Sequence, residues 1–383
     1  MEEWREYRLG EIAEFKTGKL NSNAAVQKGK FPFFTCAPET YFINEYAFDQ
    51  KAILLAGNNA EGNFNIKYYE GKFNAYQRTY IINPISSKVD ILFLFYALQL
   101  CLHQFKTLSQ GTSTKFLTAK ILNAFSVRVP STTTQQRIVG IIKSLDDKIE
   151  VNRRINENLE QQAQALFKSW FVDFEPFKNG EFVESELGMI PKGWRIGCLN
   201  EIGEITMGTS PAGSSYNIVG EGDVFYQGRA EFGFRFPHRN MYTTEPKRFA
   251  DVNSVLLSVR APVGDVNVAE EKCCIGRGLA SIKSKNGCNS YILYLMKGLN
   301  SVFEQFNGEG TVFGSINKKS LEQISVIIPK DEIIENFDKI CKPFDKQIKN
   351  NEQESRRLAQ LRDTLRPRLM SGELKVNEIE NVL

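Results

Sequence analysis

The 383-residue sequence predicts an α+β protein: two similar mixed α/β domains joined by two long helices that form an antiparallel coiled coil, with pseudo-two-fold symmetry. Two observations lead to this fold class. The apolar strand FSVRVP at 125–130 returns as ISVIIP at 324–329, which is 199 positions later (324 − 125). After the proline that stops each strand, the hydrophobic period changes from two residues to a helical repeat.

Other segments of the chain repeat in the same order. WREYRLGEIAEFKTG from Trp4 aligns with WRIGCLNEIGEITMG from Trp194, and ILLAGNNAEGNFNI from Ile53 aligns with VLLSVRAPVGDVNV from Val255. Short alternating apolar runs, separated by Gly and Asn, predict strands in both copies, and 91–105 predicts a helix. The expected division is domain 1–130, helix 131–175, linker 176–193, domain 194–329, and helix with tail 330–383.

Two matching helical seams follow the repeated strands, with apolar residues in steps of four and three. Their positions are Ile138, Ile142, Leu145, Ile149, Asn152, Asn156, Leu159, Ala163, Leu166 and Trp170 in the first, and Phe337, Cys341, Phe344, Ile348, Asn351, Ser355, Leu358, Arg362, Leu365 and Leu369 in the second. Arg362 interrupts the second seam, and we expect Leu361 to replace it there. Two independent amphipathic surface helices are the alternative interpretation.

The order of domain, helix, domain, helix makes an antiparallel pairing the expected one. Asn152 would then face Ser355, and Asn156 would face Asn351, so that a polar layer lies at the centre and fixes the register. Asparagines that face solvent are the alternative. The 32 steps from Ile138 to Trp170 span about 48 Å at about 1.5 Å per residue.

Composition limits the possible functions. The net charge is +3 and only two histidines are present, so a general polyanion-binding surface and His-based metal or triad chemistry are not expected. Seven cysteines without a CxxC spacing indicate a reducing, cytoplasmic location. No signal peptide is expected at MEEWREYRLG, and ILFLFYALQLCL from Ile91 is too short for a bilayer and predicts a core helix.

Asn, Gln and Arg recur in polar loops of both repeats, and two domains held apart by paired helices suit a two-part site on duplex DNA. Arg suits guanine and Asn or Gln suits adenine, while Lys and Thr hold phosphates. Strand-end capping and turn geometry are the alternative roles. The candidates from these loops are Asn58, Asn59, Asn63, Gln77, Arg78, Gln227, Arg229, Arg260 and Arg277, with Thr112, Lys115, Thr311 and Lys318 in the repeated GT segments.

Two long segments resemble a known family. LFKSWFVDFEPFKNGEFVESELGMIPKGW from Leu166 resembles the central conserved region of the specificity subunits of type I restriction-modification systems. LRDTLRPRLMSGEL from Leu361 resembles their second conserved region, and the resemblance in architecture covers the whole chain. GKLNSN at 18–23 and GTSPAGSS at 208–215 match the polar loop after the first strand of such domains, which adds Lys19, Asn21, Thr209 and Ser210 as DNA-binding candidates, together with Lys16 just before the first segment.

The resemblance implies a DNA-reading subunit with two target recognition domains, each for one part of a split asymmetric sequence. It implies double-stranded DNA, two methylation subunits and two restriction subunits as partners, and no membrane. S-adenosylmethionine, ATP and Mg would be used by those partners, and this chain would hold no cofactor of its own.

The residues themselves predict no active site. An adenine methyltransferase needs an Asn/Asp-Pro-Pro-aromatic tetrapeptide, and NPIS at Asn83 lacks the second proline. GEGTVFG from Gly308 does not fit a GxGxxG nucleotide loop. Two function classes remain at this point: a non-catalytic DNA-reading subunit that recruits partners, and a duplicated scaffold that binds protein or glycan.

Overall fold

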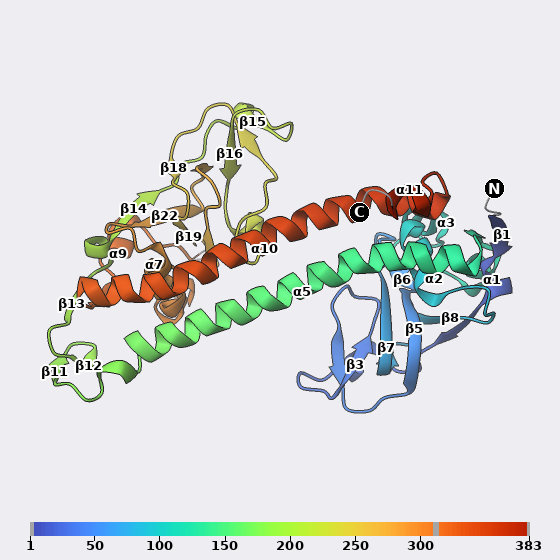
Figure 1. The fold of residues 1–383 in the computed structure, drawn as a ribbon, viewed down its shortest axis with the longest axis horizontal. Helices are drawn as coiled ribbons and strands as arrows, with labels where there is room; N and C mark the ends of the chain where they lie inside the picture. The colour runs from blue at the N-terminus through green and yellow to red at the C-terminus, as the bar shows by residue number, and fades with distance from the viewer. Residues whose placement is uncertain (1–3, 309–313, 381–383) are drawn as a thin grey trace. The chain divides into compact units, whose positions relative to one another are not determined.

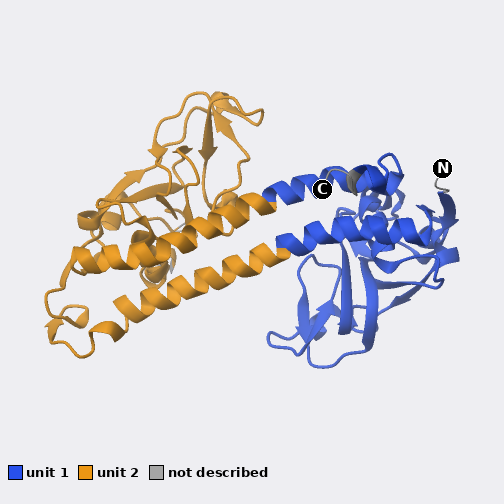
Figure 2. Cartoon of the chain, viewed as in Figure 1, with its two compact units in different colours: residues 1–149, 356–383 blue, residues 150–355 orange. Residues whose placement is uncertain are grey.

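The computed structural model describes residues 4–308 and 314–380 (Figure 1). The chain divides into two compact units: unit 1 comprises residues 1–149 and 356–383, and unit 2 comprises residues 150–355 (Figure 2). Two long helices, α5 (Thr132–Phe171) and α10 (Asp331–Ser371), each contribute to both units. Each helix begins just after the proline that ends a repeated strand, as predicted.

Unit 1 is built on a six-stranded sheet of order β2-β8-β5-β7-β3-β4, with two-stranded pairs β1-β10 and β6-β9 beside it. Its elements are β1 (Arg5–Arg8), α1 (Leu9–Ile12), β2 (Ala13–Thr17), η1 (Ser22–Ala24), β3 (Phe31–Phe34), β4 (Tyr41–Ile43), β5 (Phe48–Ala56), β6 (Asn58–Asn59), β7 (Ile66–Ala75), β8 (Thr79–Pro84), α2 (Ile91–Leu100), α3 (Leu102–Leu108), β9 (Lys115–Phe116), α4 (Ala119–Ala124), β10 (Ser126–Val129) and α11 (Val376–Glu380).

Unit 2 holds a four-stranded sheet, β14-β22-β19-β20, and a five-stranded sheet, β15-β17-β16-β21-β18. Its elements are η2 (Glu175–Phe177), β11 (Phe182–Ser185), β12 (Gly188–Pro191), β13 (Arg195–Cys198), α6 (Leu199–Ile202), β14 (Gly203–Met207), η3 (Gly213–Ser215), β15 (Tyr216–Asn217), β16 (Asp223–Tyr226), η4 (Arg229–Glu231), β17 (Tyr242–Thr243), β18 (Phe249–Ala250), β19 (Val255–Ser258), β20 (Val266–Val268), β21 (Cys273–Ile275), β22 (Leu279–Ser284), α7 (Asn289–Gly298), α8 (Asn300–Gly308), α9 (Lys318–Glu322) and β23 (Ser325–Ile328).

The duplication predicted from sequence is confirmed by strand registers. FSVRVP forms β10 and pairs antiparallel with β1, and ISVIIP forms β23 and pairs antiparallel with β13. In unit 1, β2 and β5 both pair with β8; in unit 2, β14 and β19 both pair with β22, in the same relative registers. The two units therefore repeat one arrangement of strands, and this gives a residue-by-residue correspondence between them.

The predicted helix over 91–105 is two helices in the structure, because α2 ends at Leu100 and α3 begins at Leu102. Helix α2 begins where Asp90 accepts hydrogen bonds from the backbone N–H groups of Leu92 and Phe93, and it packs on β5 and β7. Among the described residues no single helix has the length and apolar composition of a membrane span; α2 and α3 pass that test only as a pair, across a 59° bend.

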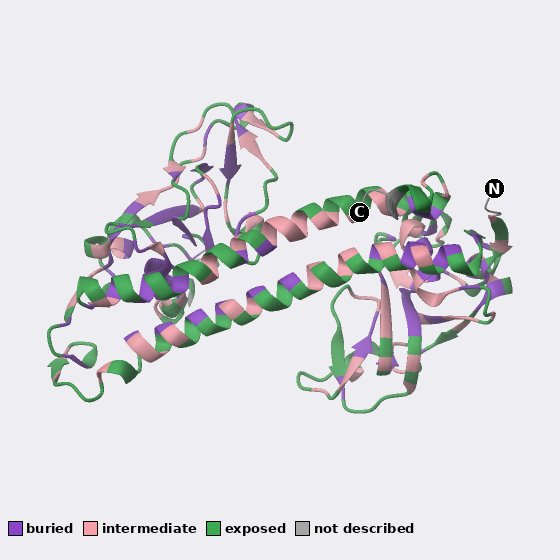
Figure 3. Cartoon of the chain, viewed as in Figure 1, coloured by how far each residue is buried: buried purple, intermediate pink, exposed green. Residues whose placement is uncertain are grey.

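The apolar faces of α5 and α10 pack into the units that contain them (Figure 3). Within unit 2 the two helices run antiparallel, since Asn152 lies beside Ser355, and Asn156 beside Asn351. All the predicted seam residues are buried or half-buried. The expectation that Leu361 replaces Arg362 is wrong: Leu361 is 40% exposed, and Arg362 stays half-buried because Asp146 accepts from it at 2.8 Å.

The predicted polar layer is confirmed. Asn152, Asn156 and Asn351 are 0%, 2% and 4% exposed. The amide nitrogen of Asn152 donates to the Glu354 carboxylate at 2.7 Å and to the Ser355 hydroxyl at 3.3 Å. The amide nitrogen of Asn351 donates to Oδ1 of Asn156 at 2.8 Å. The alternative of solvent-facing asparagines is therefore excluded, and the register of the helices in unit 2 depends on these amides.

A buried arginine joins the β-rich part of unit 2 to both of its long-helix segments. Arg235, in the loop between β16 and β17, is 2% exposed and pairs with Glu160 of α5 and with Asp345 of α10, at 2.5 Å from the latter. It also donates to the Tyr294 hydroxyl of α7 at 3.0 Å, and Lys297 pairs with Glu160. Burial raises the pKa of Glu160, but the charges of Arg235 and Lys297 outweigh it, and the pKa lies below its usual value.

Replacing Asn152, Asn156 and Asn351 together by leucine should raise the melting temperature by several degrees, because apolar contacts replace buried amides. The same change should allow more than one register between the two helices. Cysteines introduced at Ile149 and Leu358 would then form a disulfide in only part of the molecules, whereas the single register of the wild-type helices should allow complete cross-linking. Asn350→Leu, at an exposed position of α10, is the control. A lower melting temperature of the triple variant would contradict this expectation.

Arg235→Ala should lower the free energy of unfolding of unit 2 by roughly 3–5 kcal/mol, because Glu160 and Asp345 are left without their buried partner. The carboxylate of Glu160 has a lowered pKa, so the network stabilises at neutral pH and this contribution is lost as the pH falls through that pKa. Urea titrations at neutral and acidic pH measure the difference in free energy of unfolding between the wild-type chain and Arg235→Ala. This difference should be smaller at acidic pH. Lys283→Ala, which breaks an exposed pair with Asp251, should leave stability unchanged.

Candidate nucleic-acid interface

In unit 1 three segments meet at one end of the main sheet. The loop after β2 contacts the turn between β7 and β8, where the backbone N–H of Gln77 donates to Leu20 O at 2.9 Å and the Gln77 side chain donates to Asn21 at 2.7 Å. The third segment is β6, and the backbone N–H of Gly57 just before it donates to Arg78 O at 2.8 Å. The polar side chains of these three segments therefore lie at the same end of unit 1.

Strand β9 completes this end of unit 1. Asn58 pairs with Phe116, and Asn59 pairs with Lys115. The guanidinium of Arg78 lies over the Phe116 ring, 5.3 Å from its centroid, which fixes its position. The structure therefore brings together six of the predicted DNA-binding candidates: Asn21, Gln77, Arg78, Asn58, Asn59 and Lys115.

A hollow of about 500 Å³ lies among these segments, lined by Asn58, Asn59 and Tyr76 together with Ser22, Asn23, Thr35, Cys36, Ala37 and Tyr41. The Oδ1 atom of Asn58 is buried here and has no hydrogen-bond partner among the described residues. A buried acceptor without a donor is unfavourable, and an incoming N–H group would satisfy it. Tyr76 and Asn23 were not predicted, although both flank predicted residues in sequence.

Unit 2 repeats the arrangement with different side chains. The loop after β14 contacts the turn between β21 and β22: Thr209 N–H donates to Ile275 O at 3.0 Å, and Ser210 accepts from Arg277 N–H at 3.3 Å. Arg260 pairs with Ser315 across an isolated bridge. Arg260 and Arg277 line one hollow of about 490 Å³, and both are exposed.

Glycine permits the closest approach in both units. A Cβ atom at Gly18 would lie 1.7 Å from Ala75 O, and a Cβ atom at Gly208 would lie 2.2 Å from Gly276 O. The loop after the first strand can therefore pass directly against the turn only where the residue has no side chain. The same requirement at matched positions is a further sign that the two surfaces are equivalent.

The other predicted residues fall outside these groups or at their margins. Lys16 pairs with Glu14 on β2, Arg229 pairs with Asp265, and Lys318 pairs with Glu322 at the start of α9. The backbone N–H of Asn63 donates to the side-chain Oδ1 of Asn59 at 3.0 Å. Lys19, Thr112 and Gln227 are exposed on loops, and Thr311 lies outside the described residues.

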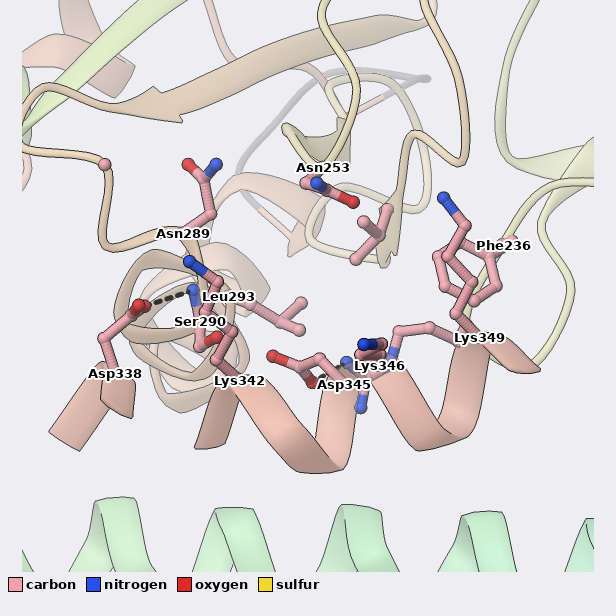
Figure 4. Close-up of a pocket in the computed structure, with 13 residues that line it drawn as sticks. Phe236, Asn253, Asn289, Ser290, Leu293, Asp338, Lys342, Asp345, Lys346 and Lys349 are labelled. Carbon is pink, nitrogen blue, oxygen red and sulfur yellow. Dashed lines mark hydrogen bonds and ion pairs between the residues drawn. The ribbon is translucent and has the colours of Figure 1, made fainter. Parts of the chain in front are cut away.

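A separate pocket of about 370 Å³ in unit 2 lies between α10 and the beginning of α7 (Figure 4). Lys342, Lys346 and Lys349 line it from α10, four and three residues apart. Asp338 on the same helix accepts a hydrogen bond of 2.9 Å from the backbone N–H of Ser290, which caps α7. These lysines were not predicted as site residues, although spacings of four and three residues place them on one face of a helix.

The described part of the chain holds no cluster of side chains that could bind a metal ion. No group of three or more His, Cys, Asp or Glu side chains gathers there. All seven cysteines are free thiols, and burial raises the pKa of the Cys101 thiol to about 11 and of the Cys273 thiol to about 12. What the matched loops offer is hydrogen-bonding amides and guanidinium groups, the side chains that read base edges.

Comparison with known proteins agrees with the geometry. The type I restriction modification DNA specificity domain matches residues 1–161 and 191–360. The MjaX specificity subunit of Methanocaldococcus jannaschii, assigned provisionally to a type I restriction enzyme, is 32% identical over 346 residues, covering 85% of this chain and 78% of that protein. The type I restriction enzyme EcoDI specificity subunit of Escherichia coli is 27% identical over 379 residues, covering 91% and 84%.

The fold has a match among solved structures as well. The crystal structure of a type I restriction-modification S subunit from M. genitalium superposes with a TM-score of 0.65 at 16% identity, covering 96% of both chains. Two β-rich domains with packed long helices are thus the fold of that subunit too. The chain belongs to the family of type I restriction-modification DNA specificity subunits, the non-catalytic component of those enzymes.

Proposed function

We propose that this chain reads a bipartite, asymmetric DNA sequence, with residues 1–130 reading one half and residues 194–329 reading the other. The main support for this proposal is that the two units hold corresponding groups of loops. Strands with the same relative registers position the loops in both units, but the loop side chains differ between the units. Because the strand arrangements match, both units can present their loops to DNA in the same way. Because the side chains differ, the two units can recognise different half-sites.

The segments 131–175 and 330–383 would hold the two recognition domains apart, with 176–193 as the linker between them. Gathered loop residues would contact the bases, and the exposed lysines and threonines at the margins would contact phosphates. The net charge of +3 is small for a DNA-binding chain, and partner subunits that surround the DNA would supply further phosphate contacts.

The complex would contain two methylation subunits and two restriction subunits around double-stranded DNA in the cytoplasm. Those partners would use S-adenosylmethionine, ATP and Mg, and this chain would supply the sequence recognition. The chain's contribution to catalysis is then to place a methylation subunit next to a chosen adenine.

Arg78→Ala and Arg277→Ala should each weaken DNA binding, and each should affect a different half of the target. If the lost contact is to a guanine edge, the cost should be about 1–3 kcal/mol with specificity relaxed at that position. The test measures the affinity of each variant chain, in complex with the methylation subunits, for a panel of DNA targets that differ by single bases. Arg128→Ala is the matched control, because that exposed arginine also lies over an aromatic ring, Trp4, at 5.7 Å, but on strand β10.

Replacing residues 194–329 with the matching segment of another specificity subunit should change one half of the recognised sequence and leave the other half and the spacer unchanged. Each unit has its own hydrophobic core and loops, and the helical segments 131–175 and 330–370, which contribute to both cores, are retained. Sequencing the modified adenines in cells with the chimera and its methylation partner tests this. A simultaneous change of both half-sites would show that the domains do not read independently.

A further inference from the structure

The strand registers assign each loop residue of unit 1 a counterpart in unit 2. Phe34 and Ala75 pair in unit 1 as Tyr226 and Ile275 pair in unit 2. Within the turns that follow, Thr79 N–H donates to Tyr76 O, and Leu279 N–H donates to Gly276 O. The offset through this turn is therefore 200 (279 − 79), so Gln77 corresponds to Arg277, and Arg78 corresponds to Gly278.

A second pair follows from the neighbouring segment. Gly57 N–H donates to Arg78 O, and Val259 N–H donates to Gly278 O, so the offset there is 202 (259 − 57). Asn58 therefore corresponds to Arg260. The strand partners agree, since Asn58 pairs with Phe116 and Arg260 pairs with Ser315, at the offset of 199 (315 − 116) that holds for that part of the chain.

At both pairs of positions unit 1 carries an amide where unit 2 carries a guanidinium. Arg260 and Arg277 line the same hollow, and neither has an ion-pair partner in the described part of the chain. Two other exposed arginines of unit 2 are neutralised, Arg195 by Glu201 and Arg229 by Asp265. Two arginines left with free N–H forks, converging on one hollow, can donate to the O6 and N7 acceptors of guanine.

The two amides of unit 1, Asn58 and Gln77, offer hydrogen-bonding groups that suit adenine instead of guanine. Gln77 gives one N–H to Asn21 and keeps its carbonyl oxygen and its other N–H, the pair that adenine N6 and N7 require. The Oδ1 atom of Asn58 is a buried acceptor without a donor. Arg78 lies one residue further along the turn, against Phe116, and its counterpart is a glycine, so it does not belong to either matched pair.

We propose that these two matched positions determine base choice: Arg260 and Arg277 select guanine in the half-site read by unit 2, and Asn58 and Gln77 select adenine in the half-site read by unit 1. This inference rests on the proposed function, because it assigns bases to a surface that function places on DNA. Beyond the proposed function, it identifies the residues that make the two units select different bases.

The test uses the chain in complex with its methylation subunits and selection from a randomised duplex library. Arg277→Gln and Arg260→Asn place the residues of unit 1 at the matched positions of unit 2. Each should lower the preference for guanine over adenine at one position by roughly 5- to 150-fold, with the other half-site unchanged. Gln77→Arg should lower the preference for adenine in the opposite half by a similar factor.

Arg277→Lys separates base reading from charge, because lysine keeps the charge and loses the planar fork. Base reading through the planar fork predicts a weaker guanine preference with an unchanged salt dependence of binding. Arg195→Gln is the control for removing an exposed arginine of unit 2, and melting curves confirm that each variant is folded.

A uniform loss of affinity over all sequences in Arg277→Gln would assign this arginine to phosphate and overturn the proposal. A wild-type half-site for unit 2 without guanine would overturn it as well. Both outcomes leave the proposed function intact, whereas a wild-type complex without any sequence preference would refute that function itself.

Discussion

The burial of three asparagine amides is the constraint on which the helix pair of unit 2 depends. Asn152, Asn156 and Asn351 have little access to water and satisfy their hydrogen bonds across the two helices. A slip by one turn would bring Asn156 opposite Ile348 or, in the other direction, Asn152 opposite Leu358. A buried amide against an apolar side chain leaves its donors unpaired, at a cost of about 1–3 kcal/mol for each group. The apolar seam provides most of the attraction, while the amides select one alignment from those that the seam alone would permit.

The domains are attached to this helix pair through related polar contacts. Tyr294 donates to Asp345 at 3.2 Å in unit 2, and Tyr96 donates to Asp146 at 3.0 Å in unit 1. The two aspartates are 199 positions apart (345 − 146), the offset of the helices themselves. Burial raises the pKa of both tyrosines, so each stays a neutral hydroxyl donor. The arginine partners differ, with Arg362 from the helix in one unit and Arg235 from a domain loop in the other.

Features that recur at a fixed spacing along the sequence could be predicted, and side-chain contacts between unrelated positions could not. The seam, the polar layer and the repeated strands were legible because each recurs at a fixed spacing. Arg362 appeared as a flaw, since its partner Asp146 lies 216 positions away, and Arg235 gave no signal because Glu160 and Asp345 are 75 and 110 positions from it. Arg78 and Arg277 were both predicted as DNA-binding residues, but only the backbone hydrogen bonds showed that Gln77 is the counterpart of Arg277.

The first and last described segments of the chain lie together in unit 1. Trp4 packs near Phe93, and a Cβ atom at Gly372 would come within 2.6 Å of the Trp4 indole nitrogen. Residues 176–193, by contrast, lie between the two repeats as a short hairpin region. The connectivity is therefore close to cyclic: a peptide from the last segment back to the first, with a break in the hairpin, would preserve every strand pair of both domains. A circularly permuted chain, in which the second repeat comes first, would then have the same fold.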